Sequence, residues 1–100
     1  MYVVAFRYAV GADRAAAFER TYGGDGAWAR FFATGAGYLG TDLLRSQDGD
    51  YLLLDRWDSA AACEAFLAAN REEYGRRGRE AESLYEREER LGAYDLVEPV

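Results

Sequence analysis

The chain has 100 residues, half of them apolar and 15% aromatic, which is enough for the hydrophobic core of one domain over residues 1–100. Disordered chains combine low hydrophobicity with high charge, so intrinsic disorder is excluded. The 12 basic and 18 acidic residues leave a formal charge of −6, which argues against nucleic acid or an anionic membrane as a partner. No apolar run approaches the ~20 residues that span a bilayer, and the first residues lack the basic start of a signal peptide.

The chain contains no histidine and one cysteine, Cys63. The missing histidine excludes His-ligated haem, His-rich zinc sites, Ser-His-Asp triads and Cys-His dyads. Catalysis would therefore depend on Tyr, Trp, Asn, Arg and carboxylate side chains. A lone cysteine cannot form an internal disulfide, so we expect a reducing, cytoplasmic location. Neither a dinucleotide-binding nor a phosphate-binding glycine motif occurs, and we expect no cofactor.

The N-terminal third predicts one strand and two short helices. Tyr2 to Val10 alternates between a strongly apolar face and a mildly polar one, which is typical of a strand. Asp13 is a suitable N-cap for a helix that the glycines between Gly23 and Gly26 would end. A second helix is predicted over Ala27 to Thr34, where aromatic residues recur at helical spacing.

The middle of the chain predicts a β-hairpin. Tyr38 to Ser46 and Tyr51 to Trp57 are typical strands, and Asp48-Gly49 between them is a strong hairpin-turn signal. Asp58 or Ser59 then caps a helix that reaches Asn70. The apolar face of this helix continues with one polar member through Cys63, Phe66, Leu67, Asn70 and Tyr74.

The C-terminal third predicts an interrupted helix, a charged helix and a short strand. Gly75 and Gly78 are expected to interrupt the helix beyond Asn70, and Glu80 to Leu91 to form another. A narrow apolar stripe and an i, i+4 pair of Glu86 with Arg90 support that last helix. Gly92 would be its C-cap, followed by a strand over Ala93 to Val97.

The predicted order β-α-β-β-α-β, with each α segment split in two, is that of a ferredoxin-like α+β fold. In this fold the first and third strands are central, and here both are apolar on both faces. Helices can cover only one face of a four-stranded sheet, so we expect a homodimer in which a second sheet covers the other face. The alternative is a surface on which scattered apolar residues are tolerated.

Two segments resemble the antibiotic biosynthesis monooxygenase (ABM) family. They are Gly37-Tyr38-Leu39-Gly40-Thr41-Asp42-Leu43-Leu44-Arg45 and Tyr51-Leu52-Leu53-Leu54-Asp55-Arg56-Trp57-Asp58-Ser59, followed by a helix with Phe66. The resemblance implies a dimeric α/β barrel of two ferredoxin-like protomers. It leaves function open, because the family includes cofactor-free quinol oxygenases, haem-degrading enzymes and members without assigned chemistry. The haem-degrading branch uses a helical histidine, which this chain lacks.

Three residues are candidates for catalysis, each with a structural alternative. The Trp57 indole would hold an oxyanion or oxygen intermediate, or else belong to the core. The Asn70 amide would donate to a substrate carbonyl or enolate, or else satisfy a helix end. The Tyr74 phenol, one turn beyond Asn70, would donate to the substrate, or else lie at the rim of the core.

An aromatic group is expected to bind a flat substrate, with ordinary core packing as the alternative. Its members are Trp28, Phe31, Phe32, Tyr51 and Phe66.

Asp55 shares a strand face with apolar residues and is therefore either paired or functional. Arg7 on the first strand is a candidate partner, whereas Arg56 points to the opposite face. Cys63 is expected to be buried, and the arginines from Arg76 to Arg79 to lie on a salt-bridged surface.

These expectations lead to one preferred function and two alternatives. The preferred function is a cofactor-independent monooxygenase that acts on a small aromatic phenol, anthrone or quinol. The first alternative is a dimeric protein that binds a small ligand without catalysis. The second is a structural dimer whose pocket is filled by its own side chains.

Overall fold

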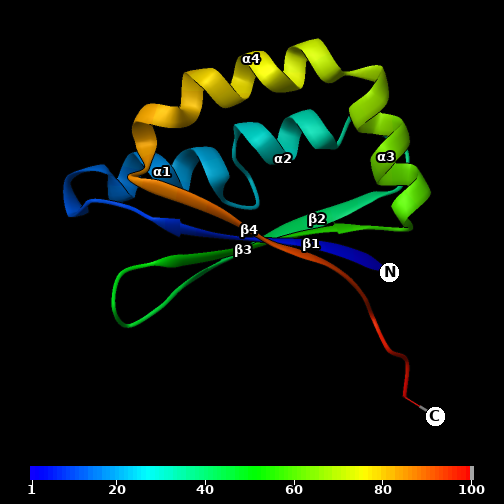
Figure 1. Ribbon diagram of the computed structural model, residues 1–100, viewed down its shortest axis with the longest axis horizontal. Helices are drawn as coiled ribbons and strands as arrows, with labels where there is room; N and C mark the ends of the chain where they lie inside the picture. Colours follow the sequence, from blue (N-terminus) through cyan, green and yellow to red (C-terminus); the bar gives the residue numbers. More distant parts are fainter. Residues whose placement is uncertain (100) are drawn as a thin grey trace.

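A four-stranded antiparallel sheet forms one layer of the computed structural model, which describes residues 1–99 (Figure 1). Its strands are β1 (Tyr2–Ala9), β2 (Tyr38–Arg45), β3 (Tyr51–Trp57) and β4 (Arg87–Asp95). Their order across the sheet is β2-β3-β1-β4, so the two strands that are apolar on both faces are central. The ferredoxin-like α+β fold is thereby confirmed.

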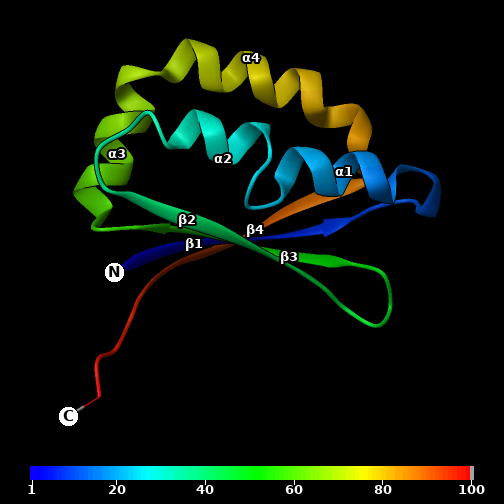
Figure 2. The ribbon, with the colours of Figure 1, turned by 180° about the vertical axis from the view of Figure 1, so that it is seen from behind.

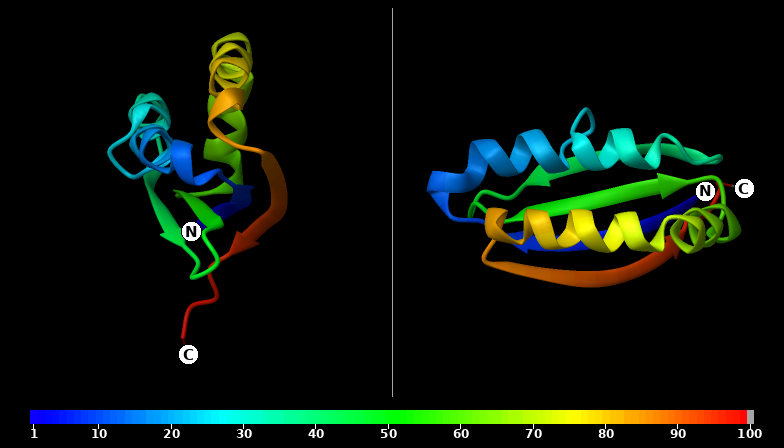
Figure 3. Two further views of the ribbon diagram at one scale, coloured as in Figure 1. Left: turned by 90° about the vertical axis from the view of Figure 1, so that its left-hand side faces the viewer. Right: turned by 90° about the horizontal axis from the view of Figure 1, so that it is seen from above.

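The helices all lie on one face of the sheet, as Figures 1 and 2 show from opposite sides. They form two rows along the strands, visible from above in Figure 3. The first row holds η1 (Ala12–Arg14), α1 (Ala15–Tyr22) and α2 (Ala27–Phe32), and the second α3 (Ala60–Ala69), α4 (Arg71–Ala81) and η2 (Glu82–Leu84). Ser59 caps α3, because its Oγ accepts a hydrogen bond from the Ala62 amide at 3.1 Å. No helix within residues 1–99 is long and apolar enough to cross a membrane.

The predicted interruption of the second helix row is wrong, because α4 continues through both Gly75 and Gly78. A helical glycine costs about 1 kcal/mol relative to alanine, and neighbouring contacts can offset that cost. The arginine-rich surface of α4 is confirmed, since Arg76 pairs with Glu73 and Glu80.

The predicted helix over Glu80 to Leu91 is also wrong, because Arg87–Asp95 forms the edge strand β4. Its side chains are mostly exposed, so they lack the alternation that marks a half-buried strand. Pairing with β1 satisfies the backbone there and overrides the helix preference of Glu and Arg. The predicted helical pairing of Glu86 with Arg90 is wrong for the same reason.

Gly92 is part of a β-bulge and not a helix C-cap. Ala5 pairs with Gly92 and Phe6 with Arg90, which leaves Leu91 as an extra residue on β4. The φ angle of Gly92 is +144°, a conformation that favours glycine. Beyond the bulge, Arg90 lies opposite Phe6 and Glu88 opposite Tyr8, so both side chains are on the face that the helices cover.

The strand register separates Arg7 from Asp55. Val4 lies opposite Asp55, and Arg7 lies opposite Leu52, on the other face of the sheet. The predicted Arg7–Asp55 partnership is therefore wrong. Arg56 does point to the opposite face from Asp55, where its Nε donates to Asp42 at 3.0 Å.

Two clusters of buried side chains fill the space between sheet and helices. One comprises Val4, Phe31, Phe32, Trp57, Cys63 and Phe66, which confirms that Cys63 is buried. The other comprises Tyr8, Phe18, Tyr22, Tyr51, Leu53 and Ala81. Phe6 and Trp28 pack against both clusters and therefore mark the region where they meet.

Candidate functional site

A cavity of about 230 Å³ opens where the two clusters meet. Strands β1, β3 and β4 form its floor, and α1, α2 and α4 form its walls. Its volume is somewhat below the usual range of about 300–1,000 Å³ for small-molecule sites. The lining residues are Phe6, Tyr8, Tyr22, Trp28, Phe32, Leu53, Asp55, Tyr74, Gly75, Gly78, Arg79, Glu82, Tyr85 and Glu88.

Half of the residues that line the cavity are aromatic. The Tyr8 ring centroid lies 5.0 Å from that of Tyr22. The Trp28 centroid lies 5.4 Å from that of Tyr74 and 5.6 Å from that of Phe32. Rings at these separations pack against one another, so the wall presents an aromatic surface that suits a flat aromatic ligand.

Four phenols line the cavity and remain protonated at neutral pH. Burial raises the pKa of Tyr8, Tyr22, Tyr74 and Tyr85 above the usual value of a phenol. The Tyr8 hydroxyl donates a hydrogen bond to Glu88 Oε2 at 2.7 Å, which raises the pKa of Tyr8 further. Tyr8 uses its one hydroxyl hydrogen on Glu88, so the neutral O–H groups of the other tyrosines are the ones that can donate to an oxygen atom of a ligand.

Asp55 is the acidic group of the cavity floor and is only 8% exposed. The Thr41 hydroxyl donates to Asp55 Oδ1 at 2.7 Å and itself contacts the Tyr38 hydroxyl. Burial raises the pKa of Asp55 to about 6, although the hydrogen bond from Thr41 acts in the opposite direction. This carboxyl group therefore changes protonation state close to neutral pH.

Gly75 and Gly78 form a section of the wall on α4 that carries no side chain. A Cβ at Gly78 would have no atom within 4 Å, and one at Gly75 would meet only Arg79 Nη1, at 3.4 Å. Packing in the protein therefore does not require either glycine. Their effect is to widen the cavity beside Arg79, Glu82 and Glu88.

Three of the residues predicted for the site line the cavity: Trp28, Phe32 and Tyr74. Trp57 lies outside it, in the cluster at the end of β3, and is 1% exposed. Its ring centroid is 5.3 Å from that of Tyr38 and 5.5 Å from that of Phe66. The structure thus places Trp57, Phe31 and Phe66 in the core next to the cavity.

Asn70 and Tyr51 also lie away from the cavity. Asn70 ends α3, and its Nδ2 donates to the Phe66 carbonyl at 2.8 Å, which matches the structural alternative considered for it. The Tyr51 hydroxyl donates to Glu19 near the β2–β3 hairpin. Neither side chain is among those that line the cavity.

Sequence reasoning missed Tyr8, Tyr22 and Glu88 as site residues. The alternation of the first strand places Tyr8 on the apolar face, and Tyr22 falls at helical spacing in the first helix. Both therefore carried a signal that could have made them candidates. Glu88 carried no such signal, because its segment was expected to be a helix.

Among residues 1–99, no group of three His, Cys, Asp or Glu side chains is arranged to hold a metal ion. The chemical groups available in the cavity are phenols, carboxyls, the Trp28 indole and the Arg79 guanidinium. Such a set can bind a ring, donate hydrogen bonds to its oxygen atoms and accept a proton.

The ABM (antibiotic biosynthesis monooxygenase) family model matches residues 1–76, and no curated protein matches the chain. Similar solved structures include a proposed antibiotic biosynthesis monooxygenase from Deinococcus radiodurans, with 18% identity and a TM-score of 0.71 over 100% of this chain and 96% of that one. SnoaB, a cofactor-independent oxygenase from Streptomyces nogalater, has 22% identity in its mutant form and a TM-score of 0.71 over 99% and 95% of the two chains. The TM-scores, over nearly the whole length of both chains, show that this chain shares its fold with these proteins.

Proposed function

We propose that this chain, which belongs to the antibiotic biosynthesis monooxygenase family, is a cofactor-independent monooxygenase acting on a small aromatic phenol, anthrone or quinol. The observation that carries the proposal is the cavity beneath α4, where aromatic rings, four of them neutral phenols, surround one buried carboxyl. SnoaB, which shares the fold, supports the proposal of an oxygenase without a cofactor, since that protein is a cofactor-independent oxygenase.

The proposed reaction needs an electron-rich substrate that reacts with O₂ once it has lost a proton. In an anthrone, the ring methylene becomes a carbonyl: one oxygen atom enters the product and the other leaves as water with the two methylene hydrogens. The electrons come from the substrate, so atoms and electrons balance without a further reductant. The task of the protein is to bind the ring and stabilise the enolate.

Tyr74 and Tyr22 are the proposed donors to the enolate oxygen. Both line the cavity as neutral phenols, and Trp28 lies next to both of them. A donor that is already oriented stabilises developing negative charge more than water does, because it does not have to reorganise. Trp57 and Asn70, which were candidates on the sequence, are assigned no contact with substrate in this proposal.

The test is oxygen consumption by the purified protein with anthrone, using isotopically heavy O₂ and mass spectrometry of the product. Wild type should insert one heavy oxygen atom per product molecule. Tyr74→Phe should lower kcat by about 100-fold, because it removes one donor from the transition state. Asn70→Ala is the matched control, and we expect it to retain kcat because Asn70 lies outside the cavity.

Two results would contradict the proposal in different ways. If no phenol, anthrone or quinol supports oxygen uptake but anthrone raises the melting temperature, the protein binds ligands without catalysis. If anthrone causes neither effect, the cavity has no role toward such ligands and the structural-dimer alternative remains. If the kcat of Asn70→Ala is as low as that of Tyr74→Phe, the reaction does not take place in this cavity.

Two further features complete the proposal. We propose that the chain assembles as a homodimer through the sheet face that carries no helix, which is tested below. We also propose a cytoplasmic location, because Cys63 is a free thiol among residues 1–99.

A further inference from the structure

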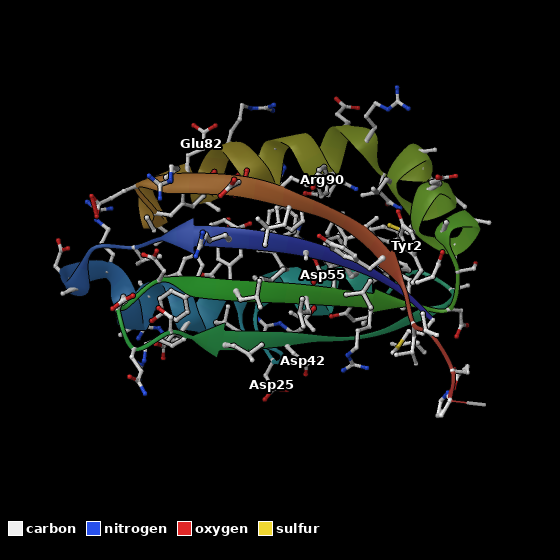
Figure 4. The ribbon with its side chains drawn as sticks, turned by 60° about the horizontal axis from the view of Figure 1, so that its bottom comes forward. Tyr2, Asp25, Asp42, Asp55, Glu82 and Arg90 are labelled. Carbon is white, nitrogen blue, oxygen red and sulfur yellow. The ribbon has the colours of Figure 1, made fainter. Side chains whose placement is uncertain are left out.

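Asp55 and Thr41 are the two polar residues buried among the described side chains, and they are hydrogen-bonded to each other. Asp55 is a member of the cavity floor on the central strand β3. Figure 4 shows it over the middle of the sheet, with Asp42 toward the β2 edge. A ligand that fills the cavity would therefore contact this carboxyl group.

Asp55 forms no ion pair among residues 1–99. Arg7 and Arg56 project from the other face of the sheet, and Arg90, which shares the face of Asp55, is not paired with it. Placing a carboxyl in a low-dielectric site without an ion-pair partner is unfavourable, and carboxyls in this situation occur often at functional sites.

The two carboxyl oxygens of Asp55 have different surroundings. Oδ1 accepts the hydrogen bond from Thr41, whereas the described residues place no donor on Oδ2. Thr41 has one hydroxyl hydrogen and uses it on Asp55, so the contact with Tyr38 is a bond that Tyr38 donates. The chain Tyr38–Thr41–Asp55 thus fixes one oxygen and leaves the other for a ligand.

We propose that Asp55 is the proton acceptor of the reaction, with Oδ2 taking the proton from the bound ring while Thr41 holds Oδ1. This inference rests on the proposed function and adds a catalytic residue to it. With an anthrone, a methylene C–H bond breaks and its electron pair stays on the substrate as the enolate. The proton forms an O–H bond on Oδ2, and Asp55 becomes a neutral carboxylic acid.

Thr41 and Tyr38 are positioning residues in this scheme. A donor on Oδ1 stabilises the ionised form of Asp55, so removal of the Thr41 hydroxyl should shift ionisation to higher pH. Other titratable groups also face Asp55 and contribute to the pH at which it ionises. They are Tyr8 of β1, Tyr22 of α1, Cys63 of α3, Tyr74 and Arg79 of α4, and Glu88 and Arg90 of β4.

The proton-transfer step can be measured without oxygen. Anthrone is incubated with the protein in heavy water under argon, and nuclear magnetic resonance follows exchange of the methylene hydrogens for deuterium. Wild type should accelerate exchange, and Asp55→Asn should slow it by about 100-fold or more, because general-base catalysis is lost. Asp42→Asn is the matched control, since Asp42 pairs with Arg56 on the opposite face and should leave exchange unchanged.

A second variant tests the same idea if Asp55→Asn fails to fold. Thr41→Val should move the midpoint of the exchange rate against pH upward, whereas a purely structural role would lower the amount of folded protein without moving the midpoint. Tyr38→Phe should move the midpoint less, because the Thr41–Asp55 bond remains.

The outcomes separate this inference from the proposed function. If wild type exchanges hydrogen, Asp55→Asn does so slowly and wild type consumes no oxygen, Asp55 stands as the proton acceptor and the oxygenase proposal fails. If wild type consumes oxygen and Asp55→Asn is as fast in exchange as wild type, the oxygenase stands and this inference is overturned. Absence of exchange in wild type, or a midpoint unchanged in Thr41→Val, overturns it as well.

Discussion

Ionisation of Asp55 opposes folding, because the carboxylate is transferred from water into a nearly enclosed site. The pKa of Asp55 is raised from 3.8 to about 6 in the folded protein. The folded state therefore holds the proton more tightly than the unfolded state between these values, and stability falls as pH rises through about 6. The full cost at neutral pH and above is about 3 kcal/mol.

Asp55→Asn should therefore stabilise the protein at about pH 8 by roughly 3 kcal/mol, since the amide keeps the shape and carries no charge. The gain should disappear near pH 4, where wild-type Asp55 is protonated in the folded state. Urea unfolding across this pH range measures the effect. Asp42→Asn serves as the control with an exposed carboxyl, and an Asp55→Asn variant that is less stable than wild type at both ends of the range would contradict the prediction.

At the scale of the secondary-structure elements, α4 carries two glycines that its own packing does not require. Replacing either would favour the helix, but a side chain at Gly75 or Gly78 would project toward the cavity. The two glycines thus make helix α4 less stable but leave space for a ligand in the cavity. Such a loss of stability is common where stability and function compete.

Gly78→Ala should raise the free energy of unfolding by about 1 kcal/mol, which corresponds to roughly 4–8 °C in melting temperature for a domain of this size. Gly78→Leu should abolish the rise in melting temperature that anthrone causes, because the larger side chain occupies the cavity. Both are measured by thermal unfolding with and without anthrone.

Gly49 provides the matched control for that prediction. A Cβ at Gly49 would also have no atom within 4 Å, but the φ angle of this residue is +93° in the hairpin turn. Gly49→Ala should therefore destabilise the protein by about 1 kcal/mol and leave the anthrone effect intact. Equal stabilisation by Gly49→Ala and Gly78→Ala would show that helix propensity is not the cause.

At the scale of the whole molecule, one face of the sheet carries no helix (Figures 1 and 3). Val3, Leu52 and Leu54 lie near the middle of this face and are half-buried, and Leu44 and Tyr94 toward its edges are exposed. Such an apolar face is unfavourable in water, and a second copy of the sheet would cover it.

The homodimer proposal predicts that Leu54→Asp converts the protein into a monomer, because the substitution places a charge in the middle of the contact. Sedimentation velocity at micromolar concentration measures the change. Ala65→Asp on the exposed side of α3 is the control and should leave the dimer intact. A wild-type protein that sediments as a monomer would remove the proposal.

The sequence was sufficient for elements whose local pattern matches their final environment. The hairpin from Tyr38 to Trp57 combines alternation with Asp48-Gly49, and its two strands pair as those features predict. The helix capped by Ser59 was equally evident. The order of these elements then leads to the ferredoxin-like fold, in which β1 and β3 are central.

The sequence was insufficient where a contact distant along the chain determines the outcome. Arg87–Asp95 has helix-favouring residues, and only pairing with β1 makes it a strand. The same pairing brings Glu88 to Tyr8, 80 residues away, and so forms one end of the cavity. Asp55 was recognisable as either paired or functional, but the register alone excluded Arg7 and assigned Thr41.

By itself, then, the sequence determined the fold class, the hairpin and the family resemblance, because these depend on patterns within a few tens of residues. It also excluded histidine chemistry outright. The tertiary structure decided which aromatic residues border a cavity and which, like Trp57, pack in the core, because helical spacing is the same in both cases. It also decided that Asp55 faces the cavity without forming an ion pair to Arg7 or Arg56, since that depends on how three strands align.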